Sequence, residues 1–401
     1  MRPPGTVVLR NARVWRDGAA RAGELVLAGG RVAASAETSA PGGTEVDLGG
    51  RLLLPGLVNG HDHLDFSTFP PIGRPPYASA YEWAADVNAG DGDPAAKAAL
   101  SVPLADRLFL GGLRNLLSGV TAVAHHGPYH RSLGREGFPV HVLSRYQFAH
   151  SPGLTPHLRR TYRSTDRRIP WMIHVAEGND ARCWEEVRAL RTARLLRENT
   201  VLVHAIALGA EDRAAIAEAG ASVVWCPESN RHLYGTTAGV RELLEAGVRV
   251  GLGSDSPISG VRDALSNLAA AHREAVLGTD ALLGLAGPST AEVARLPGGR
   301  LRPGDRADVA AFRSLEGLLA GDRDALELVL MEGRPLYGDA DLMTALGAPG
   351  WPLSVDGRAR RLERRLGRRA AALLRAHPGV REVSWAAGLD IDTDERGGLR
   401  G

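Results

Sequence analysis

The chain has few of the residues that define several classes of protein. Its 401 residues include only two cysteines, Cys183 and Cys226, which are far apart and form no Cys-x-x-Cys pair. This spacing excludes a disulfide framework and a structural zinc site built on cysteine, and it suits a reducing compartment. Aromatic residues make up 5% of the chain and hydrophobic residues 44%, so the core must be mainly aliphatic.

The net charge is also small, and long apolar runs are absent. The formal net charge is only +2 at pH 7, which provides no extended field for a nucleic acid or a membrane surface. No run of eighteen apolar residues occurs, and residues 1–6 lack the basic start and apolar core of a leader peptide. We therefore expect a cytoplasmic protein that acts on a small molecule and binds neither nucleic acid nor a membrane. A homo-oligomer is possible.

Short strands occupy the first part of the chain. Residues 6–54 alternate apolar and polar positions, and Gly29-Gly30 separates two strands in the manner of a hairpin turn. The same pattern returns over residues 299–340. We expect residues 1–54 and 299–340 to form one small, discontinuous β-sandwich domain.

Residues 55–298 instead alternate apolar strands with helical stretches, for example helices over 183–197 and 211–219. Such alternation predicts the α/β class with a parallel sheet, and the number of units favours a (β/α)8 TIM-type barrel. Seven strands are recognisable, within residues 51–60, 119–124, 140–143, 171–174, 201–204, 221–225 and 248–253. The eighth must be abbreviated, within 145–151 or 154–169.

Residues 341–401 are predicted to be a helical extension and a tail. A basic helix is expected over residues 358–375, with leucines near one face, and residues 390–401 are charged, rich in glycine and expected to be disordered. The helix could contact nucleic acid, but Glu363 and the balanced total charge favour a solvated surface or an oligomer contact.

Polar residues follow several of the predicted strands. His61 and His63 follow the first strand, and because alternate side chains of a strand face the same side, they project together, roughly 6 to 7 Å apart. His174 and Glu177 end the fifth strand, His204 the sixth, and Asp255 the last. Active sites of parallel barrels lie at these strand ends, so we expect these side chains to meet.

In these ordered motifs the chain resembles the amidohydrolase superfamily, in particular its branch of deaminases and chlorohydrolases related to cytosine and guanine deaminases. The resemblance extends from about residue 6 to residue 340. The matching segments are LPGLVN at 54–59, His61-x-His63, His174-Val-Ala-Glu177, His204, CPESN at 226–230, GLGSDS at 251–256 and GDRADV at 304–309.

The resemblance implies one divalent metal ion, zinc or alternatively iron, held by His61, His63, His174 and Asp255. Neutral imidazoles with one carboxylate leave net positive charge on the ion, which lowers the pKa of a bound water toward about 7. A metal-bound hydroxide would then be available at neutral pH.

Lys97 is the only lysine of the chain and lies in a polar stretch between the first and second strands. Binuclear members of the superfamily bridge their two ions with a carbamylated lysine near the end of the fourth strand. This chain offers no lysine there, so we expect a mononuclear centre.

The catalytic roles are assigned to three residues. Glu177 is placed to carry a proton to the substrate nitrogen and then to the leaving amine. Asp255 would accept the proton of the water, and His204 would polarise or hold the developing oxyanion. The alternative for Glu177 is an acid that interacts with the dipole at a helix start.

Candidates for substrate contact are Trp83, His126, Arg145 and Asn230, which lie on loops after predicted strands. Asp62 points away from its two neighbours and is expected to support the site. The family's nucleobase deaminases commonly carry small residues after the aspartate, whereas this chain has Ser256-Pro257-Ile258-Ser259, so a nucleobase substrate is not implied.

The function expected is therefore hydrolysis of a non-peptide C–N bond, as in deamination of a cyclic or heteroaromatic amidine. Opening of a cyclic amide or imine, or a chlorohydrolase-type displacement, is the alternative within enzymes. A catalytically inactive scaffold of the same fold is the alternative of another class, although all four implied ligands are present.

Overall fold

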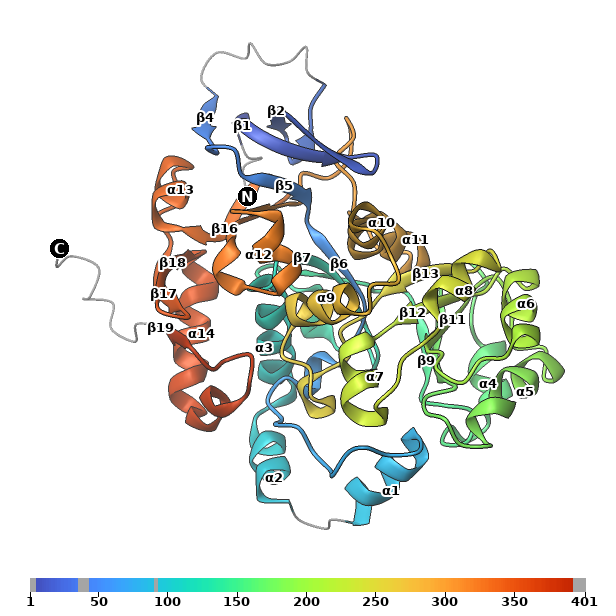
Figure 1. Ribbon diagram of the computed structural model, residues 1–401. Helices are drawn as coiled ribbons and strands as arrows, with labels where there is room; N and C mark the ends of the chain where they lie inside the picture. Colours follow the sequence, from blue (N-terminus) through green and yellow to red (C-terminus); the bar gives the residue numbers. More distant parts are fainter. Residues whose placement is uncertain (1–4, 35–42, 90–92, 392–401) are drawn as a thin grey trace.

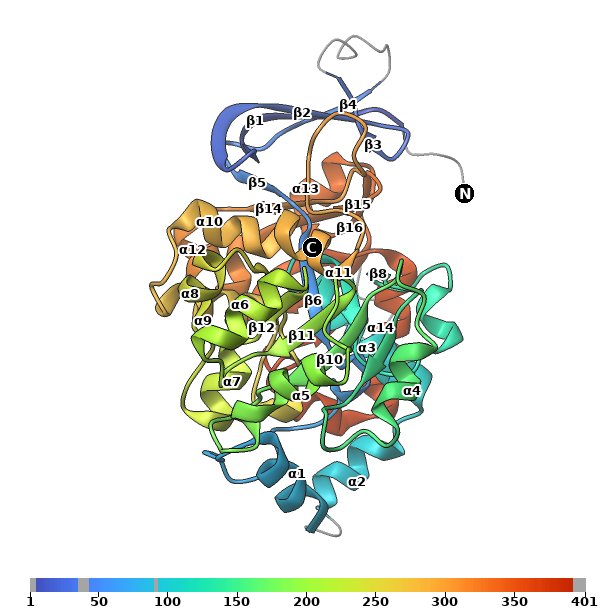
Figure 2. The same cartoon turned by 90° about the vertical axis from the view of Figure 1, so that its right-hand side faces the viewer.

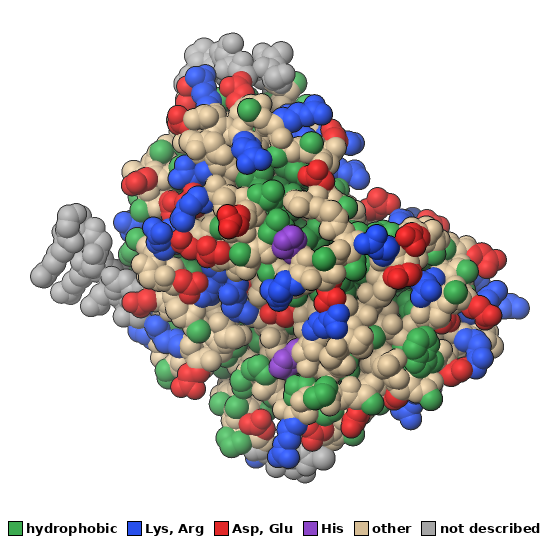
Figure 3. All heavy atoms as spheres, in the orientation of Figure 1, with side chains coloured by type: hydrophobic (Ala, Val, Ile, Leu, Met, Phe, Trp, Pro, Cys, Tyr) green, Lys and Arg blue, Asp and Glu red, His purple; other side chains and the backbone are tan. Residues whose placement is uncertain are grey.

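The computed structural model describes residues 5–34, 43–89 and 93–391, so most of the expected disordered tail lies outside the described residues. Within that part of the chain, no helix combines the length and apolarity that crossing a membrane requires. Basic and acidic side chains are interspersed over the face shown in Figure 3, in keeping with the small net charge.

Eleven of the described strands form one mixed sheet from both ends of the chain. They are β1 (Val7–Arg16), β2 (Ala19–Ala28), β3 (Arg31–Val32), β4 (Thr44–Asp47), β5 (Leu52–Pro55), β14 (Val309–Phe312), β15 (Leu326–Met331), β16 (Arg334–Asp339), β17 (Trp351–Val355), β18 (Arg358–Leu362) and β19 (Leu389–Ile391). The expected hairpin at Gly29-Gly30 is confirmed, because β2 and β3 pair antiparallel around it. Strands β5 and β14 pair antiparallel and join the two chain segments.

Two parallel sheets make up the middle of the chain, so the predicted α/β class is confirmed. The first contains β6 (Leu57–Asp62), β7 (Val120–His125) and β8 (His141–Val142). The second contains β9 (Gln147–Ala149), β10 (Trp171–Val175), β11 (Thr200–His204), β12 (Ser222–Trp225) and β13 (Arg249–Leu252). A parallel bridge between Asp62 and Asp255 connects the ends of β6 and β13.

The missing strand of the sequence prediction is β9, which lies within the first of the two candidate segments, 145–151. It has only three residues, and β8 before it has two. Both are too short to show a hydrophobic pattern, but β9 pairs parallel with β10 and so takes its place in the sheet.

The apolar run at residues 51–60 is divided between two sheets at Gly56. Before it, β5 belongs to the mixed sheet, and after it, β6 belongs to a parallel sheet. A side chain at Gly56 would collide with that of Thr121 on β7, so only glycine allows the chain to pass this close. This change of sheet sets the direction in which β6 delivers His61 and His63.

The α-helices of the described residues pack around these sheets. They are α1 (Ala80–Ala89), α2 (Pro94–Ser101), α3 (Leu104–Leu116), α4 (Leu158–Arg163), α5 (Glu186–Thr192), α6 (Ala210–Glu218), α7 (Pro227–Tyr234), α8 (Val240–Glu245), α9 (Ala264–Arg273), α10 (Thr279–Gly284), α11 (Thr290–Ala294), α12 (Leu315–Ala320), α13 (Ala340–Ala345) and α14 (Arg364–Ala376). Figures 1 and 2 place β1–β5 at one end of the molecule and α1 and α2 at the other.

The prediction of one helix over residues 358–375 was wrong at its start. Residues 358–362 are β18, which pairs with β16 and β17, and α14 begins only at Arg364. Strands β17 and β19 also lie in the expected helical extension. The buried positions of β18 are Arg360 and Leu362, so a charged residue occupies an inward position and masks the strand alternation.

Candidate metal centre

The polar residues expected at the strand ends lie together in the structure. His61 is in β6, His63 follows it, His174 is in β10, and Asp255 lies three residues beyond β13. His61, His174 and Asp255 are buried, and the side chain of His63 is 14% exposed. Three strand segments that are far apart in sequence thus contribute to one small volume.

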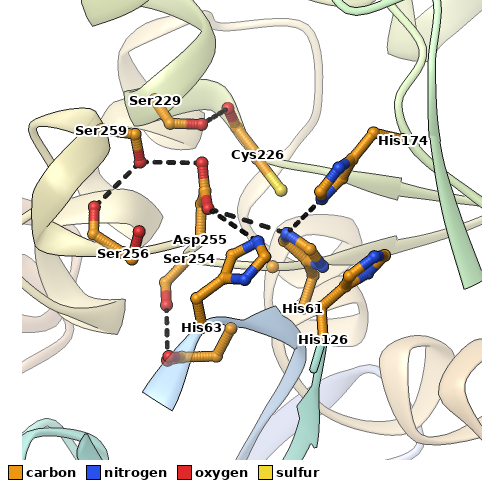
Figure 4. A network of polar contacts seen from close by, with 12 residues as sticks. His61, His63, His126, His174, Cys226, Ser229, Ser254, Asp255, Ser256 and Ser259 are labelled. Atoms are coloured by element: carbon orange, nitrogen blue, oxygen red, sulfur yellow. Dashed lines mark hydrogen bonds and ion pairs between the residues drawn. The ribbon is translucent and has the colours of Figure 1, made fainter. Parts of the chain in front are cut away.

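Short distances connect these four side chains. Nε2 of His61 lies 3.3 Å from Nε2 of His174 and 3.7 Å from Oδ1 of Asp255. The same Asp255 oxygen lies 3.7 Å from Nε2 of His63 (Figure 4). The ring of His61 stands at 90° to that of His63 and at 88° to that of His174. Since a nitrogen lone pair lies in the ring plane, rings at such angles can direct their lone pairs at one point.

His126, which follows β7, belongs to the same cluster but is oriented differently. Its ligand nitrogens lie close enough to those of His61 and His174 to form a second group with the spacing of a metal site. However, its ring stacks on His174 at a centroid distance of 4.2 Å and an angle of 13°. An ion in the plane of His174 lies outside the plane of a ring stacked on it. The orientation therefore favours His63 and Asp255 over His126 as partners of His61 and His174.

The hydrogen bond of His126 also fixes its tautomer. Nε2 lies 3.0 Å from the carbonyl oxygen of Ala149, and because a carbonyl only accepts, Nε2 carries the proton. Nδ1 then keeps its lone pair and is buried without a hydrogen-bond partner among the described residues.

The charge states of the cluster suit a divalent cation. Burial lowers the pKa of His61 to about 3 and that of His174 well below its usual range, so both rings are neutral and can donate lone pairs. Burial alone would raise the pKa of Asp255, but its contacts with His61 and His63 lower it below the usual value. Neutral imidazoles with one carboxylate are the donor set that zinc and iron accept in proteins.

Supporting contacts hold the carboxylates of this centre. Oδ2 of Asp255 accepts a hydrogen bond of 2.7 Å from Oγ of Ser259, which leaves Oδ1 toward the histidines. Asp62 points away from the rings, as expected for a residue between His61 and His63. Its buried carboxylate accepts hydrogen bonds from Arg114 at 2.7 Å and from Asn115 at 2.8 Å.

A second group of polar residues borders the histidine cluster. Oε1 of Glu177 lies 3.5 Å from Nε2 of His204 and accepts a hydrogen bond of 2.6 Å from the hydroxyl of Tyr234. Oδ1 of Asn230 accepts from Nδ1 of His204 at 2.8 Å. Glu177, His204 and Asn230 therefore form one contact chain, and Asn230 acts through His204.

The backbone is unusual at this centre. His204 has φ 71° and Asp255 has φ 60°, values in the left-handed region that residues other than glycine seldom adopt. Such conformations concentrate at active sites, where the surrounding fold holds a side chain in a required direction. His204 is the last residue of β11, and Asp255 lies three residues beyond β13, where its side chain faces His61 and His63.

Two of the predicted substrate contacts do not reach this cluster. Nε1 of Trp83 donates to the carbonyl oxygen of Ile72 at 3.1 Å, and its ring packs against apolar residues of the segment that follows β6 and of α7. Arg145 lies two residues before β9, and its side chain is 73% exposed and lies 3.7 Å from Asp166. His126 does lie within the cluster, and Asn230 borders it through its contact with His204.

Two residues of the centre were not anticipated. Tyr234 lies four positions after Asn230 in α7, and Ser259 lies four positions after Asp255. Residues four apart in a helix share a face, so the helical pattern after residue 226 was a usable signal for Tyr234. Ser259 gave no such signal, because it lies in a single turn.

Comparison with known proteins gives a consistent result. The model of the amidohydrolase family matches residues 163–333. An 8-oxoguanine deaminase from Pseudomonas aeruginosa is 28% identical over 396 residues, covering 79% of this chain and 87% of that protein. The chain is similar to members of the amidohydrolase superfamily.

Other known proteins match over different lengths. A 5-methylthioadenosine/S-adenosylhomocysteine deaminase from Archaeoglobus fulgidus is 32% identical over 197 residues, which are 44% of this chain but less than half, 46%, of that protein. A zinc-bound adenosine deaminase from Xanthomonas campestris has a similar fold, with a TM-score of 0.71 at 17% identity over 95% of this chain and 98% of its own. A zinc complex of atrazine chlorohydrolase from Arthrobacter aurescens gives 0.65 at 18% identity over 85% and 100%.

Proposed function

We propose that this protein is a metal-dependent hydrolase of a non-peptide C–N bond, which deaminates a cyclic or heteroaromatic amidine. The observation that carries the proposal is the convergence of His61, His63, His174 and Asp255 beside the Glu177–His204 pair. Deaminases among its relatives support the reaction class, and one of them acts on 8-oxoguanine according to its name.

We further infer that the eight parallel strands β6–β13 form one (β/α)8 barrel. The Asp62–Asp255 bridge between β6 and β13 supports this arrangement, as does the fold of the zinc-bound relatives. The division into a barrel at 55–298 and a small domain at 1–54 and 299–340 is likewise a proposal. The mixed sheet supports it and adds the strands at 351–391 to the small domain.

The metal would be a single divalent ion, zinc or alternatively iron. His61, His63, His174 and Asp255 are the residues that would hold it, and it would supply Lewis acidity and an activated water. Lys97 lies within α2 and is not one of the four proposed ligands. This placement supports one ion without a lysine bridge.

Proton transfer is assigned to Glu177, with Asp255 as the first acceptor of the water proton. In deamination, water adds to the amidine carbon, and one of its protons is transferred to the leaving amino group. The C–N bond then breaks and ammonia is released. Burial raises the pKa of Glu177, which brings a carboxyl group nearer to the range in which it both accepts and donates protons near neutrality. His204 is placed to stabilise the oxygen that develops negative charge.

Ammonia release by the purified, metal-loaded protein tests the proposal. The panel should contain aminated purines, pyrimidines, nucleosides and triazines, with the products identified by mass. We expect at least one substrate whose amino group is replaced by oxygen, and one equivalent of metal per chain. Ring opening without ammonia, or chloride release alone, would favour the alternative reactions, and no turnover with a full metal complement would favour the inactive scaffold.

Glu177→Gln provides the matched variant. It should retain the metal but lose turnover by about 100-fold or more, because general acid–base catalysis contributes factors of that size. Glu292→Gln, on the surface beside Arg249, serves as the control and should behave as the unmodified protein. Turnover unchanged in Glu177→Gln would contradict the assigned role.

A further inference from the structure

The segment before α1 is attached to the loop that carries Glu177. Ser79 and Gly178 form an antiparallel bridge, and the amide of Ala80 donates to the carbonyl oxygen of Glu177 at 2.8 Å. The amide of Asn179 donates to the carbonyl oxygen of Ala78 at 2.7 Å. These backbone contacts place residues 78–80 directly against the loop at residues 176–179, which follows β10.

The close approach depends on glycine. Gly178 has φ 133°, and a side chain there would collide with the backbone of Ala78 and Ser79. Residues 78–80 and 176–179 therefore form one unit, called here the Glu177 clamp.

A buried carboxylate contacts this clamp. Glu186, the first residue of α5, is 4% exposed, and its Oε2 accepts a hydrogen bond of 2.6 Å from the amide of Ala176. Its Oε1 accepts from the hydroxyl of Tyr81 in α1. Tyr81 in turn accepts from the amide of Gly153 at 3.0 Å, and the guanidinium of Arg182 lies 4.3 Å from the centre of its ring.

Ala176 requires such a partner. It has φ 52°, in the left-handed region, and lies two residues after His174 and one before Glu177. Its amide is directed at Glu186, and a buried amide without a partner is strongly disfavoured. The bond from Ala176 to Glu186 therefore selects the backbone conformation from which the side chain of Glu177 reaches His204.

The alternative is that Glu186 has only a structural role, as an acid at the first turn of a helix, where negative charge is favourable. The geometry argues against this, because both of its oxygens accept from groups outside α5. One of these groups is the backbone beside Glu177, and the other belongs to the segment that covers it.

We propose that Glu186 and Tyr81 are positioning residues that set the orientation of Glu177 through the amide of Ala176. The proposal rests on the role of Glu177 in the proposed function. Neither residue touches the reacting atoms, and both act on the rate by fixing the backbone of the clamp. Misplacement of a catalytic group by about 1 Å can cost about 100-fold in rate.

Three variants and one control test this proposal with the metal-loaded, full-length protein. Glu186→Ala removes both acceptors and should lower kcat by about 10-fold to 100-fold with KM little changed. Glu186→Gln should stay within about 5-fold of the unmodified enzyme, because its amide oxygen can accept from Ala176 and its amide nitrogen can donate to Tyr81. Tyr81→Phe should fall between the two. Tyr162→Phe, which removes a hydroxyl bonded to Asn199 away from the clamp, is the control.

Two readouts separate positioning from general loss of structure. Metal content should stay the same in every variant, and hydrogen exchange at Ala176 and Ala80 should accelerate in Glu186→Ala but not in Tyr162→Phe. Unchanged kcat and unchanged exchange in Glu186→Ala would overturn the proposal, as would a Glu186→Gln variant as impaired as Glu186→Ala. If Glu186→Ala fails to fold, Tyr81→Phe decides by the same readouts.

The exchange measurement keeps this inference distinct from the proposed function. If the unmodified protein has no C–N hydrolase activity, the proposed function is refuted. In that case, unchanged exchange at Ala176 in Glu186→Ala would separately refute the control of the loop by Glu186.

Discussion

The hydroxyl of Tyr234 donates to Oε1 of Glu177 at 2.6 Å, joining α7 to the loop after β10. Burial raises the pKa of Glu177, whereas the contacts with His204 and Tyr234 act in the opposite direction. Burial together with the negative charge of Glu177 raises the pKa of Tyr234 well above its usual range. Tyr234 therefore remains a hydrogen-bond donor over the whole working range of pH.

Replacing Tyr234 by Phe should move the acidic limb of the pH–rate profile to higher pH. A donor to a carboxylate stabilises its charged form, so losing the donor raises the pKa of Glu177 further. We expect kcat/KM at pH 7 to fall by about 10-fold, while metal content is retained. Tyr162→Phe is the control, and an acidic limb that does not move in Tyr234→Phe would show that the hydroxyl does not influence Glu177.

Replacing Arg114 by Met should strongly destabilise the fold. The pair of Arg114 with Asp62 is almost fully buried, with side-chain exposures of 1% and 0%. Removal of one partner of a buried pair leaves an uncompensated charge and typically costs about 3 to 5 kcal/mol. Denaturant unfolding of the metal-loaded protein measures this loss.

The matched control is Arg168→Met. Arg168 pairs with Asp166 at 2.8 Å, but its side chain is 86% exposed, and exposed pairs contribute at most about 1 kcal/mol. Equal losses for the two variants would show that burial does not set the value of the Arg114–Asp62 pair.

The sequence was sufficient to predict the long parallel strands. It was not sufficient to predict strands in which a charged side chain points inward. Apolar runs such as those ending at His174 and His204 identified β10 and β11 because both faces of these strands are buried. By contrast, β18 places Arg360 inward, where it is paired with Asp324 at 3.0 Å. A hydrophobic pattern cannot predict that a charged residue is buried when its partner lies in another element.

The same limit applies to the centre. His61 and His63 could be placed together from strand geometry alone, since they are two residues apart at the end of β6. Glu186 could not be linked to Glu177, because the link runs through the backbone amide of Ala176, which a side-chain pattern does not reveal. Its other partner, Tyr81 in α1, lies 105 positions earlier in the chain. Trp83 and Arg145 were assigned to the substrate by loop membership, which does not determine the direction of a side chain.

Replacing Ser259 by Ala should weaken metal binding without abolishing it. Ser259 orients Asp255 through its bond to Oδ2, and loss of a partner that orients a metal ligand typically lowers affinity by about 10-fold to 100-fold. Asp255→Ala should remove metal and activity together. Competition with a chelator measures both affinities, and Ser101→Ala, in exposed α2, is the control. Equal affinity of Ser259→Ala and the unmodified protein would exclude this supporting role.

Glu228 should make the stability of the protein depend on pH near neutrality. Burial raises the pKa of Glu228 to about 7 from its ordinary 4.5, against the hydrogen bond that Ser266 donates at 2.6 Å. For a folded-state pKa above the unfolded value, the stabilisation is complete below about pH 4.5 and is lost as the pH rises through about 7. Since one pKa unit corresponds to about 1.4 kcal/mol, the full loss at this residue is about 3 kcal/mol.

Glu228→Gln isolates this contribution, because glutamine keeps the shape of the protonated acid and does not ionise. Relative to the unmodified protein, the variant should gain stability between pH 5 and pH 8, by up to about 3 kcal/mol. Denaturant unfolding at both pH values gives the difference, and Glu292→Gln, whose side chain is 54% exposed, should show almost none. A gain that is the same at pH 5 and pH 8 would mean that Glu228 does not titrate in this range, and that its burial is compensated by Ser266.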